Sequence, residues 1–317
     1  MKYITPLLPF LGGWLVLMLS NNFAAISAIN GVLQLLLFAL VVCWPTWTTG
    51  RMSYVDIGWP WGLVIIALVT MTFAQGEAQR VTAVVLAYGF AGSRMGLEAL
   101  RMWRLGELQT ELPRYQYQHR RWQRLGKTNV KLTMQIETIL QALGNASFLA
   151  LPAFIISANP SPTISIFEVI GLVIWLAAFA MEAMADRQKQ QFVKSMQAAG
   201  KTNQVCNVGL WRYSRHPNYF AEWMVWNGLI IAAIPSWLAL YNGETLLIWA
   251  LCGAGLLFTS RIMYTTLVYY TGAVPAEFYS VQKRPSYRAY QQSTNRFFPG
   301  KPRHTVVSTS PTHTPAE

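Results

Sequence analysis

Long apolar runs separated by polar segments recur along this 317-residue chain. A helix needs about 20 residues to cross a hydrocarbon core of about 30 Å, where no water can satisfy exposed backbone groups. The pattern therefore predicts an all-α integral membrane protein, a polytopic helical bundle of about seven or eight transmembrane helices. The apolar runs cover residues 4–20, 24–44, 55–74, 81–100, 132–157, 163–184, 217–240 and 245–265.

The first run is the least regular because it contains Pro6, Pro9, Gly12 and Gly13. A signal peptide also begins with a basic residue and an apolar run, but no small-residue cleavage site follows cleanly here. We therefore interpret the run as a membrane segment. Composition agrees with the bundle, since 12% of the residues are charged, against about 25% in soluble proteins.

The 25 Lys and Arg residues are unevenly placed relative to the runs. All except Arg80, Arg94 and Arg261 lie at the N-terminus, after the second run, in two loops (101–131 and 186–216) or after residue 280. The positive-inside rule then predicts cytoplasmic termini and loops, in a bacterial inner membrane. The net charge of +12 follows either from this topology or from recruitment of an anionic ligand. No nucleic-acid-binding module is recognisable, so nucleic acid is not an expected partner.

No repeat or separate soluble domain stands out, so residues 1–300 are predicted to form one membrane domain. The tail 301–317 is rich in Ser, Thr and Pro and is predicted to be disordered. The three cysteines and four histidines show no disulfide or metal-ligand spacing, and no metal site is expected. The sequence indicates no particular protein partner.

Eight ionisable side chains fall inside or at the ends of the runs, where a charge costs at least about 2.5 to 3.5 kcal/mol unless paired or hydrated. They indicate a polar cavity in the bundle, although some have simpler explanations. Glu137 and Glu168 lie near run ends and are expected to reach headgroup water. Asp56 lies in a first helical turn, where the helix dipole favours a carboxylate, and is equally an active-site candidate. The eight are Asp56, Arg94, Glu98, Glu137, Glu168, Glu182, Glu222 and Arg261, of which Arg94 and Glu98 have the spacing to pair with each other.

The segment LWRYSRHPNYFAEW, residues 210–223, sets polar residues against the start of the seventh run. Pro217 suits the first position of a helix because its missing N–H would be unbonded there, and Ser214 is a candidate cap. Arg212, Arg215 and His216 would then gather at the positive end of the helix. Guanidinium groups and free backbone N–H groups both suit phosphate or carboxylate, so the segment predicts an anion site.

Two columns of residues spaced by four follow from the helical period. Below the predicted anion site, one face of the seventh run carries Asn218, Glu222 and Trp226. The cytoplasmic extension of the sixth run carries Asp186, Gln190 and Lys194. This second column either binds the hydroxyl and amine groups of a nucleotide or is a solvated helix face.

Several motifs resemble the DUF1295 branch of the membrane-embedded steroid 5α-reductase-like family. They are SYVDIGWPWG, SRMGLEALRMWR, LPRYQY, ADRQKQQF, GLWRYSRHPNYFAEW, YRAY and RFFP, and they span nearly everything between about residue 50 and residue 300. The resemblance implies that a C-terminal half, about residues 130–300, binds NADPH from the cytoplasm, while the N-terminal half opens to a lipid-soluble substrate. The residues that it places around the nucleotide are Asp186, Gln190, Lys194, Arg212, Arg215, His216, Asn218, Tyr219 and Glu222, with Tyr287 and Tyr290 closing over it.

The tripeptide Arg-His-Pro does not by itself choose a chemistry, because it is similar in isoprenylcysteine carboxyl methyltransferases and phospholipid methyltransferases. Those enzymes use S-adenosylmethionine, so a lipid or isoprenoid methyltransferase is an alternative. A non-catalytic membrane protein that retains the fold is another. No Gly-x-Gly-x-x-Gly motif follows a strand, which argues against a Rossmann domain.

The resemblance implies hydride transfer from NADPH to an activated carbon–carbon double bond of a steroid-like or isoprenoid-like substrate. A protonated acid or tyrosine would stabilise the conjugated carbonyl oxygen as charge develops on it. Asp56 is the candidate acid. Ala91 occupies the position at which the family has its tyrosine, so Tyr88, one helical turn earlier, is the substitute candidate.

Overall fold

The computed structural model describes residues 4–303, and every regular element in that range is a helix. The tail for which disorder is predicted lies outside the described residues from position 304 onward. The helices are η1 Thr5–Leu7, α1 Leu8–Met18, α2 Ala24–Phe38, η2 Ala39–Cys43, α3 Trp44–Thr49, α4 Val55–Phe73, α5 Ala78–Arg104, η3 Glu107–Gln109, α6 Pro113–Arg124, α7 Val130–Ala146, α8 Leu151–Ala158, α9 Ile166–Ala198, η4 Gly209–Arg212, α10 Pro217–Ala239, η5 Leu240–Asn242, α11 Leu246–Thr265, η6 Thr266–Tyr270, α12 Ala273–Lys283 and α13 Tyr287–Ser293.

All eight predicted runs coincide with helices, and the all-helical membrane fold is confirmed. In the described residues, six helical segments are long and apolar enough to cross a membrane. The first run is a shorter apolar helix, Thr5–Met18, and the fourth, α5, is a 27-residue helix that carries several arginines. The six are Ala24–Thr49, Val55–Phe73, Val130–Ala158, Ile166–Ala198, Pro217–Asn242 and Leu246–Lys283.

Two helices extend well beyond their predicted ends. α9 continues through a polar stretch to Ala198 because no Gly or Pro lies between Gly171 and Gly200, which adopts a φ of 66°. α11 passes through the π-helical turn η6 into α12 and ends only at Lys283. Apolar periodicity marks the part of a helix inside the membrane, whereas the helix itself ends where its backbone is broken.

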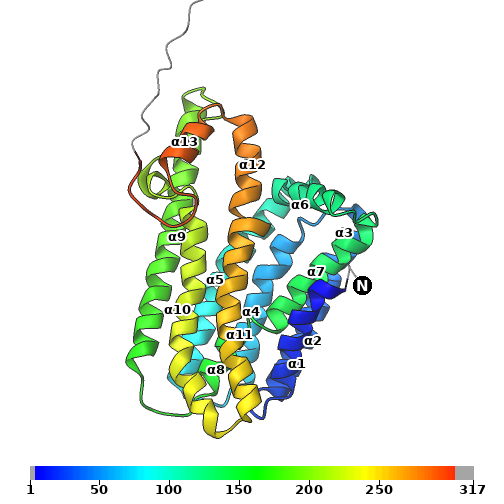
Figure 1. Ribbon diagram of the computed structural model, residues 1–317, viewed down its shortest axis with the longest axis vertical. Coiled ribbons are helices and arrows are strands. Elements are labelled where there is room, and N and C mark those ends of the chain that lie inside the picture. Colours follow the sequence, from blue (N-terminus) through cyan, green and yellow to red (C-terminus); the bar gives the residue numbers. More distant parts are fainter. Residues whose placement is uncertain (1–3, 304–317) are drawn as a thin grey trace, which may run out of the picture.

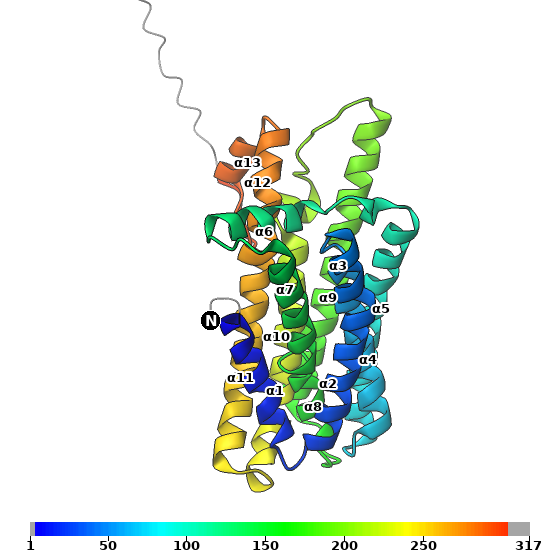
Figure 2. The same cartoon turned by 90° about the vertical axis from the view of Figure 1, so that its right-hand side faces the viewer.

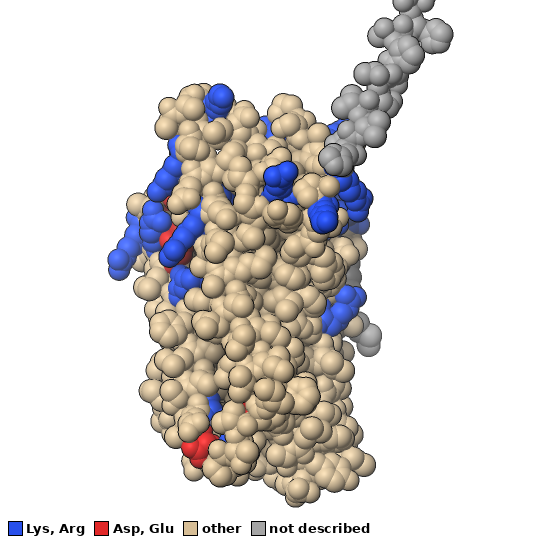
Figure 3. All heavy atoms as spheres, turned by 90° about the vertical axis from the view of Figure 1, so that its left-hand side faces the viewer, with Lys and Arg blue, Asp and Glu red and all other residues tan. Residues whose placement is uncertain are grey.

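The helices form an elongated bundle, and α6 lies across one end of it (Figure 2). α12 and α13 project at that same end (Figure 1). On the face drawn in Figure 3, Lys and Arg gather toward this end, while the opposite end is almost free of them. The separation agrees with placing the basic loops on one side of a membrane; the cytoplasmic assignment stays a prediction.

α9 and α10 approach each other most closely where two glycines face each other. A Cβ atom at Gly171 would lie 2.4 Å from the Ala232 backbone nitrogen, and one at Gly228 would lie 2.7 Å from the Gly171 carbonyl oxygen. Small residues allow the backbones of membrane helices to touch, which gives van der Waals packing where the hydrophobic effect is weak. The contact sets how α9 and α10 present their polar columns to each other.

A buried amide network joins α2, α4 and α7. Gln34 Nε2 donates to the Gly62 carbonyl oxygen at 2.8 Å, and Asn145 Nδ2 donates to Gln34 Oε1 at 3.2 Å. Asn30 Nδ2 donates to the Asn145 carbonyl oxygen at 3.2 Å. All three amide side chains are fully buried. Such bonds fix the positions of helices in an apolar surrounding, here on the side of the bundle that carries Asp56.

Candidate active site

A cavity of about 710 Å³ lies inside the bundle between α4, α5, α6, α7, α9, α10 and α11. Its volume falls within the range of about 300 to 1,000 Å³ typical of small-molecule sites. Part of its lining is polar, and part consists of side chains such as Trp59, Phe148 and Leu140. Of the residues predicted from the sequence, it brings together Asp56, Asp186, Gln190, Asn218, Tyr219 and Glu222.

Asp56 binds two side chains of α6 across the cavity rim. The Tyr115 hydroxyl donates to Asp56 Oδ1 at 2.6 Å, and Arg114 Nη2 donates to Asp56 Oδ2. Tyr115 is 3% exposed, and burial, reinforced by the Asp56 carboxylate, raises the pKa of Tyr115 well above its usual value. The phenol therefore stays protonated and can act as a hydrogen-bond donor at neutral pH.

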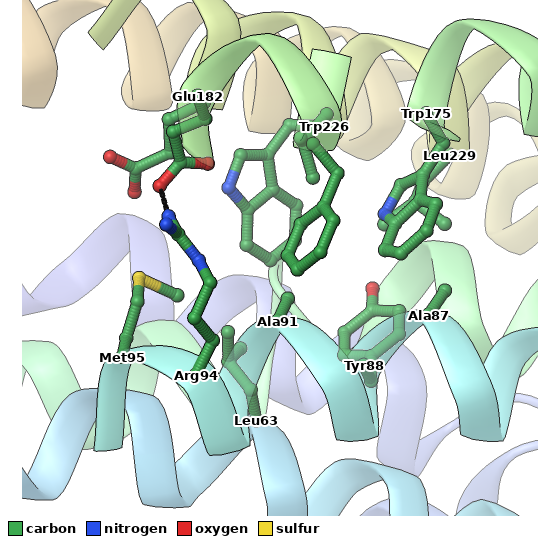
Figure 4. A pocket seen from close by; sticks show the side chains of 13 residues that line it. Leu63, Ala87, Tyr88, Ala91, Arg94, Met95, Trp175, Glu182, Trp226 and Leu229 are labelled. Carbon is green, nitrogen blue, oxygen red and sulfur yellow. Dashed lines mark hydrogen bonds and ion pairs between the residues drawn. The ribbon is translucent and has the colours of Figure 1, made fainter. Parts of the chain in front are cut away.

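Arg94 of α5 forms the centre of the polar wall (Figure 4). Its guanidinium points toward α9, where Nη2 pairs with Glu182 and Nη1 lies 3.3 Å from Asp186 Oδ2. Asn218 Nδ2 of α10 donates to the other Asp186 oxygen at 3.1 Å. The alternative in which Arg94 pairs with Glu98 is wrong, because Glu98 pairs with Arg101 at 3.1 Å. The arginine instead joins α5 to α9, and Asp186 extends the cluster to α10.

Three polar groups on this wall lack hydrogen-bond partners within residues 4–303: Arg94 Nε, Asn218 Oδ1 and the Glu222 carboxyl group. Asn218 Oδ1 is buried and has no hydrogen-bond partner. Glu222, one turn further along α10, lines the cavity and makes no hydrogen bond or ion pair within the described part of the chain. Buried polar groups are almost always satisfied in native proteins. An unsatisfied acceptor beside a free carboxyl group therefore indicates a surface that a ligand completes.

Tyr88 lies apart from Asp56. Its hydroxyl donates to the Leu149 carbonyl oxygen at 2.7 Å, and its ring stands edge-on to Trp226 at 5.9 Å. It lines a small side cavity of about 20 Å³, which it shares with Arg94 and Glu222 (Figure 4). The hydroxyl is already satisfied by the backbone, so the geometry favours Tyr115 over Tyr88 as the partner of Asp56.

Arg215 and His216 do not line the cavity. Arg215 Nε donates to Glu277 Oε1 at 2.8 Å, and its Nη1 donates to the Gln291 carbonyl oxygen at 2.9 Å. His216 Nε2 lies 3.2 Å from the same Glu277 oxygen, and burial lowers the pKa of His216 although Glu277 opposes the shift. The sequence predicts an open anion site here. In the structure the Glu277 carboxylate of α12 already occupies this position, where it pairs with Arg215 and contacts His216 in a buried cluster.

The remaining predicted nucleotide residues lie outside the cavity lining as well. Lys194 and Arg212 are exposed. Tyr287 and Tyr290 are buried in the C-terminal segment, and the Tyr290 hydroxyl donates to the Trp211 carbonyl oxygen. Pro217 begins α10 as predicted. Ser214 does not cap this helix.

The prediction that Glu137 and Glu168 reach headgroup water is wrong. Glu168 is 4% exposed and pairs with Arg80 at 2.5 Å. Glu137 lines the cavity, accepts a hydrogen bond from the Tyr270 hydroxyl and lies 3.8 Å from Lys127. Run ends are poor guides to depth because loops fold back over them.

Sequence reasoning missed Arg114, Tyr115 and Glu182 as members of the site. Arg114 and Tyr115 belong to the motif LPRYQY, so a signal was present in the resemblance. Their contact with Asp56 spans 58 and 59 residues of chain, however, and no local periodicity encodes it. Glu182 was noted as a charge at membrane depth, but its partner Arg94 lies on another helix.

These features define a class: a polytopic α-helical membrane protein with a ligand-sized cavity whose polar wall is formed by α5, α9 and α10. Within that class, the chain belongs to the family described as "Protein of unknown function (DUF1295)", whose model matches residues 45–294. It is also similar to an uncharacterized protein of Schizosaccharomyces pombe, with 27% identity over 168 residues, 48% of this chain and 44% of the yeast protein. The chain thus matches less than half the length of that relative. No solved structure matches the chain.

Proposed function

We propose that this protein is an NADPH-dependent reductase of an activated carbon–carbon double bond in a lipid-soluble substrate. The observation that carries the proposal is one cavity that joins two unlike surfaces. Its polar wall has unsatisfied groups at Asn218 and Glu222, and its rim has the acid–phenol pair Asp56 and Tyr115. The first surface suits a cofactor amide, and the second suits a carbonyl oxygen on which charge develops.

The polar wall fits the reactive end of a nicotinamide cofactor. Asn218 Oδ1, buried without a partner, would accept a hydrogen bond from the carboxamide N–H, and Glu222 would accept another. Asp186 and Gln190 would face the ribose hydroxyls. The exposed cation Arg187 lies at the same cavity lining and suits a phosphate group.

The reaction has a simple balance. When bound, the cofactor supplies a hydride to the β-carbon of an enone-like substrate. Tyr115 would turn its single hydroxyl hydrogen from Asp56 to the carbonyl oxygen as that oxygen gains negative charge, and a proton from solvent completes the α-carbon. Arg114 pairs with the Asp56 carboxylate and would still stabilise it when Tyr115 turns to the substrate. The apolar lining around Trp59 and Phe148 would hold the substrate's hydrocarbon part.

Ligand-dependent thermal unfolding of the purified protein in detergent tests the cofactor. A ligand that binds only the native state raises stability by about 2.7 kcal/mol at 100 times its Kd. NADPH is expected to raise the unfolding temperature, and S-adenosylmethionine is not. Stabilisation by S-adenosylmethionine alone would favour the methyltransferase alternative, and stabilisation by neither would favour a non-catalytic protein.

Turnover tests the donor. Tyr115→Phe removes the hydroxyl and retains the ring, and we expect it to slow NADPH oxidation about 100- to 1,000-fold with lipid-soluble enones such as a 4-en-3-one steroid or an isoprenoid enal. Tyr88→Phe is the matched control, because it removes a hydroxyl bonded to the backbone. Equal losses in the two variants would count against Tyr115 as the donor.

A further inference from the structure

The outer face of α6 differs sharply from its inner face. Tyr115, Gln118 and Trp122 are buried beneath the helix and line the cavity. Arg120, Arg121 and Arg124 are exposed on the helix. Because α6 lies across the end of the bundle (Figure 2), it has the arrangement of an interfacial amphipathic helix with a basic outer face.

The three arginines converge on a separate cleft of about 260 Å³, lined also by Tyr117 and Tyr269. No carboxylate lines this cleft, and none of the three guanidinium groups forms a salt bridge within residues 4–303. Topology alone requires basic residues on one side of the membrane, not their convergence around a hollow.

Aromatic rings hold two of these guanidinium groups in place. The Arg120 guanidinium carbon lies 5.4 Å from the Phe278 ring centre, and that of Arg121 lies 5.2 Å from the Tyr270 ring centre. Stacking limits the rotamers of a long side chain while leaving its N–H donors free, so less entropy is lost when a ligand binds.

We infer that this cleft binds the phosphate of an anionic phospholipid headgroup. Guanidinium groups suit phosphate through paired N–H donors, and tyrosine hydroxyls can add further hydrogen bonds. Tyr269 in the cleft lining is 47% exposed, and Leu125, next to Arg124 in the chain, is 61% exposed, as expected where a surface meets lipid. A lipid headgroup is thus a better match than a soluble anion.

The cleft is connected to the cavity through Tyr270. Arg121 stacks on its ring from outside, Gln118 of α6 donates to its carbonyl oxygen, and its hydroxyl donates to Glu137 of the cavity lining. A phosphate held by Arg121 would therefore hold α6 over the cavity. Lipid binding would stabilise this position of α6 whatever reaction the cavity supports.

Lipid titration tests the site on the full chain purified in a neutral detergent. The measured quantity is the concentration of dioleoylphosphatidylglycerol that gives half of the maximal increase in unfolding temperature, with dioleoylphosphatidylcholine as the neutral reference. Each basic residue near an anionic surface contributes about 1 kcal/mol, so the variant R120Q/R121Q/R124Q is expected to need roughly 100-fold more of the anionic lipid.

The control variant R104Q/K201Q/R288Q removes three exposed cations elsewhere and should retain the wild-type concentration. The variant R120K/R121K/R124K retains the charge but loses the guanidinium fork, and should bind more weakly than wild type. Equal effects of the glutamine and control variants would overturn the inference, as would unchanged affinity in the lysine variant. It would also fail if inorganic phosphate stabilised the wild type as well as the lipid does. None of these measurements depends on NADPH.

Discussion

Two arginine clusters near the start of α10 use the same residue types in opposite ways. Arg215 and Glu277 have side chains only 7% and 5% exposed, and both carboxylate oxygens accept from the guanidinium. Arg94 and Asp186 are 29% and 35% exposed, and their cluster leaves Asn218 Oδ1 unsatisfied beside the cavity. We call the Arg215–Glu277 cluster closed, because its polar groups are buried and paired, and it holds chain segments together. We call the Arg94–Asp186 cluster open, because it is partly exposed and has an acceptor without a partner, which prepares a surface for a ligand.

Breaking the closed cluster is expected to have the largest effect on stability. Arg215→Met leaves Glu277 buried without its main counter-charge, which typically costs about 3 to 5 kcal/mol. Thermal unfolding in detergent should show a large drop, and the paired variant R215M/E277M should recover part of it. An unchanged unfolding temperature in Arg215→Met would contradict the role of this pair as a clamp.

Breaking the open cluster should cost less stability and more binding. Arg94→Met removes charged hydrogen bonds to Glu182 and Asp186, each worth about 1.5 to 3 kcal/mol. Water from the cavity can hydrate those two acids, which offsets part of this loss. We expect the variant to be more stable than Arg215→Met and to lose its stabilisation by NADPH. If Arg94→Met were the less stable of the two, the contrast between the clusters would be wrong.

Asn218 allows a finer test of the open cluster. Asn218→Leu loses one hydrogen bond, to Asp186, so its cost is expected to be about 0.5 to 1.5 kcal/mol. The same change should abolish the increase in unfolding temperature caused by NADPH. Asn227→Leu is the matched control, because Asn227 lies on the same helix and bonds Trp223 and Ser260 away from the cavity.

Acid titration sharpens the description of the closed cluster and should give the smallest effect. Burial lowers the pKa of His216 in the folded protein, so the unfolded chain binds more protons as the pH falls through its ordinary value of about 6.5. Stability is therefore present above that pH and is lost on acidification. His216→Gln should flatten this part of the stability profile between pH 7 and pH 5, and an unchanged slope would argue against a neutral His216.

Much of the fold was predictable because a membrane-spanning helix needs a continuous run of apolar residues, which can be seen in the sequence. The start of α10 at Pro217 and the shared face of Asn218 and Glu222 followed from proline geometry and the helical period. Helix ends were less predictable: α9 and α12 extend past the apolar pattern, since a helix can continue into water where the hydrophobic pattern has already ended.

The pairing of charged groups could not be predicted in the same way. Arg215 was expected to face an anion and instead meets Glu277, 62 residues away. Asp56 was expected to act with a tyrosine of the next membrane helix, and the structure sets Tyr115 of α6 against it. In both cases the partner comes from a segment whose return path depends on how loops and helices pack.

The sequence by itself determined the apolar helices and the residues that share each helical face, because these depend on neighbours within one or two turns. Only the tertiary structure decided which charged groups are buried in ion pairs and which face the cavity. That choice rests on contacts such as Arg94 with Glu182 and Arg114 with Asp56, made between separate helices. In an apolar medium an unpaired charge is costly, and three-dimensional packing selects which charges are paired and with which partner.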